Sequence, residues 1–394
     1  MTRATGAGAL DPPRSRASRT ARRHDLDRLR VLAVLLLLPF HSARVFNVDS
    51  DWYVKNPRES PLLSWFVVDF LDPWHMPLLF VLAGMATWFA LGHRSPATYV
   101  RERTWRLLVP AAFGILVIVP PQPFLAQLRD AGHESSYLSF LTGGYFTNVG
   151  DLTGYDGAFT PGHMWFVVYL FVFSLVALPL FAWLRRRAAA HDIGRSWMLV
   201  AAPFLFLLAE AFPSPADAWS PFTTLAMFVC GFVLASSETL GDVVRRRWKA
   251  IVSAGVATMA AVYAVEIAGP SISEDSVADA AHQLLESSNT WLWVLGLIGA
   301  AGTYLARPST PSLRYANEAA YPWYILHQTV IVAVAYVVVG WDLGVAPKYL
   351  LVLAFSTAIT LLAYELAVRR ANVMRFLFGV KPRAEAPVRV DALR

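Results

Sequence analysis

The chain has 394 residues, of which 56% are hydrophobic and only 16% are charged. Soluble globular domains have about 25% charged residues, and the apolar residues here form long blocks, so the composition excludes an ordinary soluble domain and indicates a membrane protein with several spans. The single cysteine excludes a disulfide framework. The net charge of +6 does not indicate a nucleic-acid partner, because the distribution of the arginines along the chain explains it better.

The first 24 residues carry six arginines among Ala, Gly and Pro and predict a disordered basic arm. The apolar segment that follows lacks a small-residue cleavage site, so we interpret it as a retained first span and not as a signal peptide. A transmembrane domain is predicted over residues 25–370 and a cytoplasmic tail over residues 371–394. The expected fold class is all-α, a polytopic membrane helix bundle with about ten transmembrane helices. The predicted spans are at about 29–47, 62–92, 104–120, 163–184, 196–212, 220–237, 249–268, 290–306, 319–340 and 347–368.

The distribution of Lys and Arg predicts the orientation of these spans. All but five of the 34 Lys and Arg residues lie in segments that ten spans place on the side of the N-terminus. Because cytoplasmic loops are rich in Lys and Arg, both termini are predicted to be cytoplasmic, in a multi-pass protein of the cell inner (cytoplasmic) membrane. A single helix over residues 61–92 would be too long for one crossing, so we expect a break or an interfacial piece before Trp74.

Three histidines lie in or beside predicted spans, each with a proline nearby. Arg30 and His41 are eleven residues apart, so a helix places both side chains on one face, about 16 Å apart along its axis. His327 is predicted at a depth similar to that of His41, and His75 nearer to the outer face. Ionisable residues inside a membrane are costly and usually functional, although each histidine could also bridge two helices by hydrogen bonds.

Arginines at the inner mouth of the third predicted span indicate an anion site. Arg103 and Arg106 lie there, and with Arg30 they could hold phosphate, because a planar guanidinium binds two oxygens at once. They could equally be topology charges of the positive-inside kind. Asp72 is a candidate for the lining of an outer cavity. No Cys/His set has the spacing of a zinc site, so no metal is expected.

The longest predicted outer segment, residues 121–162, is rich in Gly, Thr, Tyr and Asp. It is either a solvated connector or a cap that meets an extracytoplasmic acceptor. His163 and Trp165 follow it and are expected to form an interfacial aromatic anchor. Near the other end of the chain, Glu365 is expected to pair with Arg369 at i+4.

At these positions the chain resembles the acyltransferase 3 family of bacterial membrane O-acyltransferases. That family has an arginine, ten residues and then a histidine in its first span, as in Arg30 and His41 here. It also has an FFxLSG-like segment, which LLFVLAG at Leu78 to Gly84 matches with Ala83 in place of the usual serine. The resemblance covers about residues 25 to 370.

Two further motifs occur in the order that the family has them. The R-x-x-R-L-x-x-P element matches Arg103 to Pro110, and the late YxLH segment matches Tyr324 to His327. The HMPL and YPWYILHQ segments are most similar to the branch that includes the glucans biosynthesis protein C succinyltransferases.

The resemblance implies transfer of an acyl group, acetyl or succinyl, from cytoplasmic acyl-CoA to a hydroxyl of an extracytoplasmic glycan or glycolipid. The expected partners are acyl-CoA as donor, a carbohydrate or lipid acceptor, and the lipid bilayer. Carried onto this sequence, it places the phosphates of CoA at the inner arginines, Arg30, Arg103 and Arg106.

The same resemblance gives the buried groups their expected roles. His41 would act as general base on the acceptor hydroxyl, or would carry the acyl group itself. His327 or Tyr324 would polarise the thioester carbonyl. His75 and Asp72 are the expected substrate-binding residues.

The alternative is a proton-coupled membrane transporter, because proline-interrupted helices and histidines near the midplane also suit a carrier. A carrier of this kind is expected to contain an internal repeat, and the sequence shows none. We therefore prefer the enzyme.

Overall fold

In the computed structural model the described part of the chain is built of helices and contains no strand, which confirms the all-α class. The structure describes residues 23–48, 51–130, 136–150, 152–213, 220–269, 272–273 and 276–383. The predicted basic arm falls almost entirely outside the described residues, as do residues 384–394 of the predicted tail. Part of that tail, Asn372–Leu377, forms the short helix α16.

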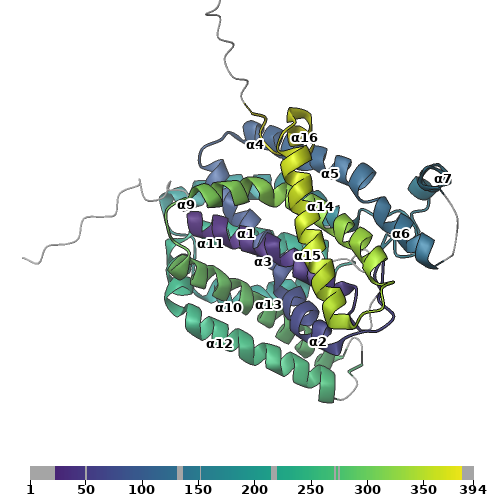
Figure 1. The fold of residues 1–394 in the computed structure, drawn as a ribbon. Coiled ribbons are helices and arrows are strands. Elements are labelled where there is room, and N and C mark those ends of the chain that lie inside the picture. Colours follow the sequence, from purple (N-terminus) through teal and green to yellow (C-terminus); the bar gives the residue numbers. More distant parts are fainter. Residues whose placement is uncertain are drawn as a thin grey trace, which may run out of the picture.

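Figure 1 shows the helices that make up the described part of the chain. Their bounds are α1 His24–Arg44, α3 Asp69–Leu91, α4 Pro96–Arg103, α5 Val109–Phe113, α6 Pro121–Asp130, α8 Trp165–Val176, α9 Leu178–Ala190, α10 Trp197–Glu210, α11 Pro221–Ser236, α12 Glu238–Ala268, α13 Val277–Tyr304, α14 Pro311–Val338 and α15 Val345–Ala363. Shorter pieces are α2 Pro61–Leu63 and α7 Tyr137–Thr142, the π-helical segments η2 Ser64–Val68, η3 Thr104–Leu108, η4 Gly114–Ile118 and η7 Tyr364–Val368, and the 3₁₀ turns η5 Tyr145–Thr147 and η6 Gly162–Met164.

Several of these helices begin at a Ser-Pro or Thr-Pro pair that the sequence shows directly. At Ser95, Ser220 and Thr310 the side-chain oxygen accepts a hydrogen bond from a backbone N–H of the first turn, and the following proline is the first helical residue. The hydroxyl satisfies one of the free N–H groups of the helix end, and proline at that position loses no hydrogen bond.

Fewer of the described helices than predicted have the length and apolar composition of a membrane crossing. Each of the ten predicted segments coincides with a helix, but among the described residues five helices are long and apolar enough to cross a membrane, or six if the pair Gly162–Val176 and Leu178–Ala190, bent by 57°, counts as one span. Helices α10 and α11 have only 14 and 16 residues. The figure of about ten crossings is therefore not confirmed.

The break expected before Trp74 is wrong. Helical structure continues from Pro61 to Leu91 through the π-helical segment η2. Pro77 cannot donate to the carbonyl of Pro73, but the hydroxyl of Thr290 on α13 donates to that oxygen at 2.9 Å. A neighbouring helix thus replaces the hydrogen bond that proline removes, and the helix does not need to end.

Two glycines bring α3 and α11 into backbone contact. A Cβ atom built on Gly84 would lie 1.9 Å from the carbonyl oxygen of Phe228, and one built on Gly231 would lie 2.1 Å from that of Val81. Small residues let membrane helices approach this closely. By contrast α12 lies at the edge of the bundle (Figure 1), and only 11% of its most apolar stretch is buried.

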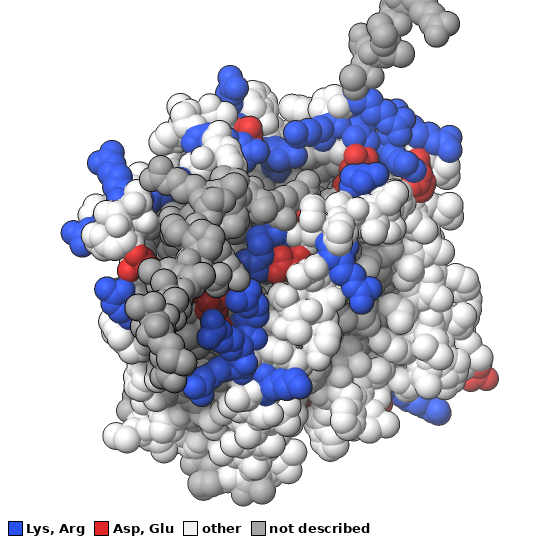
Figure 2. All heavy atoms as spheres, turned by 90° about the vertical axis from the view of Figure 1, so that its left-hand side faces the viewer, with Lys and Arg blue, Asp and Glu red and all other residues white. Residues whose placement is uncertain are grey.

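Lys and Arg side chains gather on one face of the molecule, as Figure 2 shows. Arg23, Arg245 and Arg307 line a hollow of 670 Å³ between the start of α1, the start of α12 and the end of α13. This clustering agrees with the predicted cytoplasmic side, and the orientation in the membrane stays a prediction.

Candidate functional site

The two histidines predicted at similar depth meet inside the bundle. The rings of His41 on α1 and His327 on α14 have centroids 5.0 Å apart. Eleven residues before His41 on α1, Arg30 donates to the side-chain oxygen of Asn317, also on α14, at 2.7 Å. Because the partners are spaced alike and run in the same order on both helices, α1 and α14 lie parallel, and Arg30 and His41 share the face of α1 that meets α14.

Backbone contacts fix the hydrogen position on His327. Its Nδ1 lies 2.6 Å from the carbonyl oxygen of Tyr324. A carbonyl oxygen can only accept, so Nδ1 carries the hydrogen and Nε2 carries the lone pair. His327 is fully buried, and Nε2 has no hydrogen-bond partner among the described residues. His41 is half-buried, and its Nδ1 is likewise buried without a partner in the described structure.

His163 completes the cluster, and the expectation that it anchors an interface is wrong. It is 6% exposed, and its ring lies edge-on to that of His327, with centroids 5.1 Å apart. Its Nε2 donates to the carbonyl oxygen of Ile325 at 2.9 Å, and its own backbone carbonyl accepts from the hydroxyl of Tyr324. The available sequence signal was a further histidine, directly after Pro-Gly at the start of an apolar helix.

Trp52 forms the outer wall of the cluster. Its ring stacks on that of His41, with centroids 5.3 Å apart and 18° between the planes, and the guanidinium carbon of Arg44 lies 5.3 Å from the indole centroid. The indole Nε1 is buried without a partner in the described chain. This wall therefore offers a hydrogen-bond donor, whereas the histidines offer acceptors. Trp52 comes from an irregular segment, and no sequence pattern indicated it.

Part of the outer segment 121–162 packs against this wall, and its role as a cap that meets the acceptor stays a prediction. The ring of Tyr155 lies 6.1 Å from that of Trp52, and the hydroxyl of Tyr53 donates to the carbonyl oxygen of Thr153 at 3.0 Å. Tyr145 is 3% exposed, and burial raises the pKa of its hydroxyl to about 12. The segment thus has a small core of its own.

An outer cavity of 630 Å³ begins one helical turn beyond His41. Asp72 lines it, as predicted, together with Asp69 and Arg44. His75 does not line it: this residue is 2% exposed, and its Nε2 donates to the carbonyl oxygen of Ala33 at 2.6 Å, which ties α3 to α1. A substrate-binding role for His75 stays a prediction.

The predicted inner arginines approach the same part of α14. Arg30 reaches Asn317, and one turn further the ring of Tyr321 and the backbone of Arg106 both pack against Gly379. Arg103 donates to the hydroxyl of Thr87 at 3.2 Å and lies over the ring of Tyr99. The guanidinium of Arg30 thus contacts α14 and that of Arg103 contacts α3 and α4, and the side chain of Arg30 is 42% exposed.

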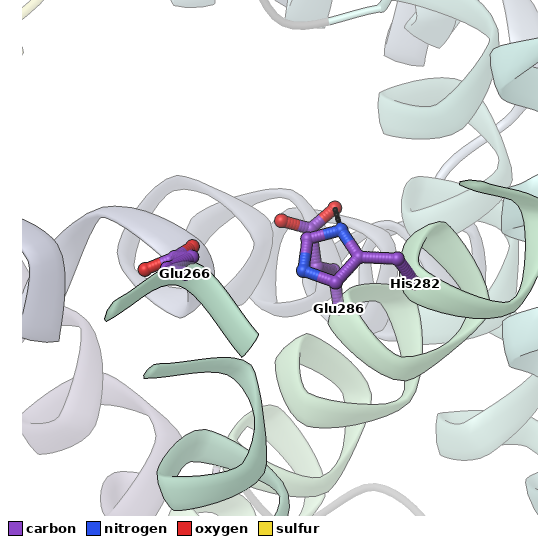
Figure 3. A group of neighbouring side chains, drawn as sticks. All are labelled: Glu266, His282 and Glu286. Carbon is purple, nitrogen blue, oxygen red and sulfur yellow. Dashed lines mark ion pairs between the residues drawn. The ribbon is translucent and has the colours of Figure 1, made fainter. Parts of the chain in front are cut away.

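A separate group of side chains has the spacing of metal ligands. Ligand atoms of Glu266, His282 and Glu286 lie within 4.8 Å of one another, and His282 Nδ1 is 3.9 Å from a Glu286 oxygen (Figure 3). Both carboxylates also line the outer cavity. The buried histidines do not have this spacing in the described structure, and the absence of a metal cofactor stays a prediction.

Comparisons with known proteins agree with the sequence motifs. Residues 23–365 match the acyltransferase 3 family model, described as an acyltransferase domain. The chain is also 25% identical over 166 residues to glucans biosynthesis protein C of Salmonella paratyphi B, Salmonella heidelberg and Salmonella enteritidis, which is 42% of this chain and 41% of each relative. The matched part thus spans about two fifths of the length of these curated relatives. No solved structure matches the chain.

Proposed function

The chain belongs to the acyltransferase 3 family of membrane acyltransferases, and from that premise we propose that it transfers an acetyl or succinyl group from cytoplasmic acyl-CoA to a hydroxyl of an extracytoplasmic glycan or glycolipid. The observation that carries the proposal is the shared face of α1, with Arg30 at one end and His41 at the other, both against α14. The name of the glucan-related proteins supports a glycan acceptor.

On the donor side, the phosphates of acyl-CoA would lie at Arg30, Arg103 and Arg106. A guanidinium that is partly exposed can bind phosphate oxygens with two N–H groups. The pantetheine arm would then run along α1 toward His41, about 16 Å away at 1.5 Å per residue.

At the histidine cluster, His41 would take the proton of the acceptor hydroxyl. The hydroxyl oxygen attacks the thioester carbon, the carbon–sulfur bond breaks, and CoA leaves as a thiolate that takes up a proton. The carbonyl-polarising role expected for Tyr324 and His327 is not supported, because the hydroxyl of Tyr324 already donates to His163 and the free nitrogen of His327 carries a lone pair.

On the acceptor side, the outer cavity supports entry of a polar substrate from outside. Asp69 and Asp72 offer acceptors for sugar hydroxyls, and Trp65 offers an apolar ring face on the same wall. Arg44 lines the cavity and also lies over the ring of Trp52, and that ring stacks on His41. The route of the acceptor would thus end at the nitrogen that takes its proton.

Incubation of the purified protein with radiolabelled acetyl-CoA or succinyl-CoA and glucan oligosaccharides tests the proposal. We expect thioester cleavage that depends on the added glucan, with the label recovered on the sugar. Solute uptake into proteoliposomes without release of CoA would instead support the transporter. Absence of labelled glycan or lipid with either donor would contradict the proposed reaction.

Replacement of Arg30 by alanine is expected to raise the KM for acyl-CoA by about tenfold or more, because a charge-assisted contact to phosphate contributes about 1.5–3 kcal/mol. The kcat should change much less, since the arginine is far from the reacting carbon. Steady-state kinetics at saturating acceptor measures both constants. Arg186→Ala, at an exposed arginine of α9, is the matched control. A KM equal to that of the wild type would remove Arg30 from the donor site.

A further inference from the structure

Two buried ring nitrogens in the cluster are defined acceptors without a protein donor. His327 uses Nδ1–H on the carbonyl of Tyr324, which leaves the lone pair on Nε2. His163 uses Nε2–H on the carbonyl of Ile325, which leaves the lone pair on Nδ1. Both free nitrogens are buried, and neither has a partner among the described residues. Their rings are adjacent.

Helix bridging alone does not explain this arrangement. A buried acceptor left without a donor costs about 1–3 kcal/mol, and in native proteins such groups call for a functional explanation. A glutamine could make the contact from His163 to Ile325 without placing a second imidazole against His327. The pair therefore presents two buried acceptors for which the described part of the chain supplies no donor.

The backbone holds His163 in this position from both sides. Its carbonyl accepts from the hydroxyl of Tyr324. The preceding Gly162 has a φ of 50°, and a Cβ atom there would lie 3.0 Å from Val119. A positive φ with so little space favours glycine. The turn η6 thus packs between α14 and the helical segment that ends with η4. This packing fixes the backbone of His163 and, with it, the orientation of the ring.

We infer that His163 Nδ1 and His327 Nε2 each accept a hydrogen bond from a further hydroxyl of the acceptor, beside the hydroxyl that His41 activates. The inference rests on the proposed function. Each lone pair needs a hydrogen of its own, so a carboxylate or the thioester carbonyl does not suit this place, whereas a sugar ring with several neighbouring hydroxyls does. His163 is then a specificity-determining residue that selects a diol over a simple alcohol.

The test compares two acceptors that differ by one hydroxyl. The full-length protein with acetyl-CoA is given trans-cyclohexane-1,2-diol or cyclohexanol, and glucan oligosaccharides in parallel. For the wild type we expect a higher kcat/KM with the diol. His163→Phe should lower kcat/KM for the diol and the glucan by about ten- to a hundredfold, with little change for cyclohexanol or for the KM of acetyl-CoA. His163→Gln, which keeps a donor for Ile325 and adds an amide acceptor, should restore part of the preference.

Trp291→Phe is the matched control. It removes a comparable ring N–H contact, to the carbonyl of Leu199 at 2.8 Å, in another helix pair, and should leave the preference for the diol unchanged. An equal loss with diol and cyclohexanol in His163→Phe, or no loss, shows a purely structural histidine and overturns the inference while the acyltransferase reaction stands. If no acceptor is acylated, calorimetric binding of the glucan decides: weaker binding by His163→Phe supports the inference, and equal or absent binding overturns it.

Discussion

Replacement of His41 by alanine is expected to lower the rate of acyl transfer by about 10³-fold or more, with the protein still folded in the membrane. A positioned acid–base group contributes about 10²–10⁴ in rate, and His41 is the histidine of the cluster that is only half-buried. His163 and His327 each have one ring nitrogen hydrogen-bonded to a backbone carbonyl, which holds the two rings in place, so neither ring can move into the position of His41. Transfer of label from acyl-CoA to the glucan measures the rate.

The control for this variant is His191→Ala, at an exposed histidine after α9, which should transfer at the wild-type rate. Size-exclusion chromatography in detergent and thermal unfolding show whether His41→Ala is folded. A folded His41→Ala protein that acylates as fast as the wild type would falsify the assignment of His41. Mass spectrometry of the wild type quenched with acyl-CoA alone separates the two open roles, since an acyl carrier shows an added acyl mass on His41 and a general base does not.

Replacement of Gly84 by alanine is expected to destabilise the folded protein by about 3 kcal/mol or more, as overpacking of a close contact does. The added Cβ atom would lie 1.9 Å from the carbonyl oxygen of Phe228, and backbone cannot move aside as a flexible side chain can. Helices α3 and α11 would have to separate. The midpoint of thermal unfolding in detergent and the yield of monodisperse protein measure the effect.

Gly241→Ala gives the comparison for this prediction. Gly241 lies in α12 with no atom within 4 Å of a built Cβ, and alanine is the better helix former, so its stability should be equal or slightly higher. A Gly84→Ala protein that unfolds at the wild-type temperature would show that α3 and α11 do not pack backbone to backbone. Gly84 also ends the LLFVLAG segment, so the glycine of that motif has a packing role here.

Much of the arrangement within single helices could be predicted. The spacing of Arg30 and His41 placed both on one face of α1, and both meet α14. Glu365 pairs with Arg369 at 2.8 Å, as the i+4 spacing predicted. Such relations depend only on the helix repeat, which is the same wherever a helix forms.

Contacts between helices decided the rest. The helix through Pro73 and Pro77 continues because a threonine on α13 supplies a hydrogen bond, and no local pattern on α3 indicates that donor. His163 and Trp52 reach the cluster from a turn and from an irregular segment, which have no period to follow.

By itself the sequence determined the all-α class, the positions of the helices, the acyltransferase family and the face that carries Arg30 and His41, because composition and the helix repeat act along the chain. Only the tertiary structure decided which histidines meet, which nitrogen of each ring carries the hydrogen, and that Tyr324 has no free hydroxyl for a carbonyl. The bonds between His163 and the segment from Tyr324 to Ile325 join residues more than 160 positions apart, and the chain specifies such partners only through the packing of the whole bundle.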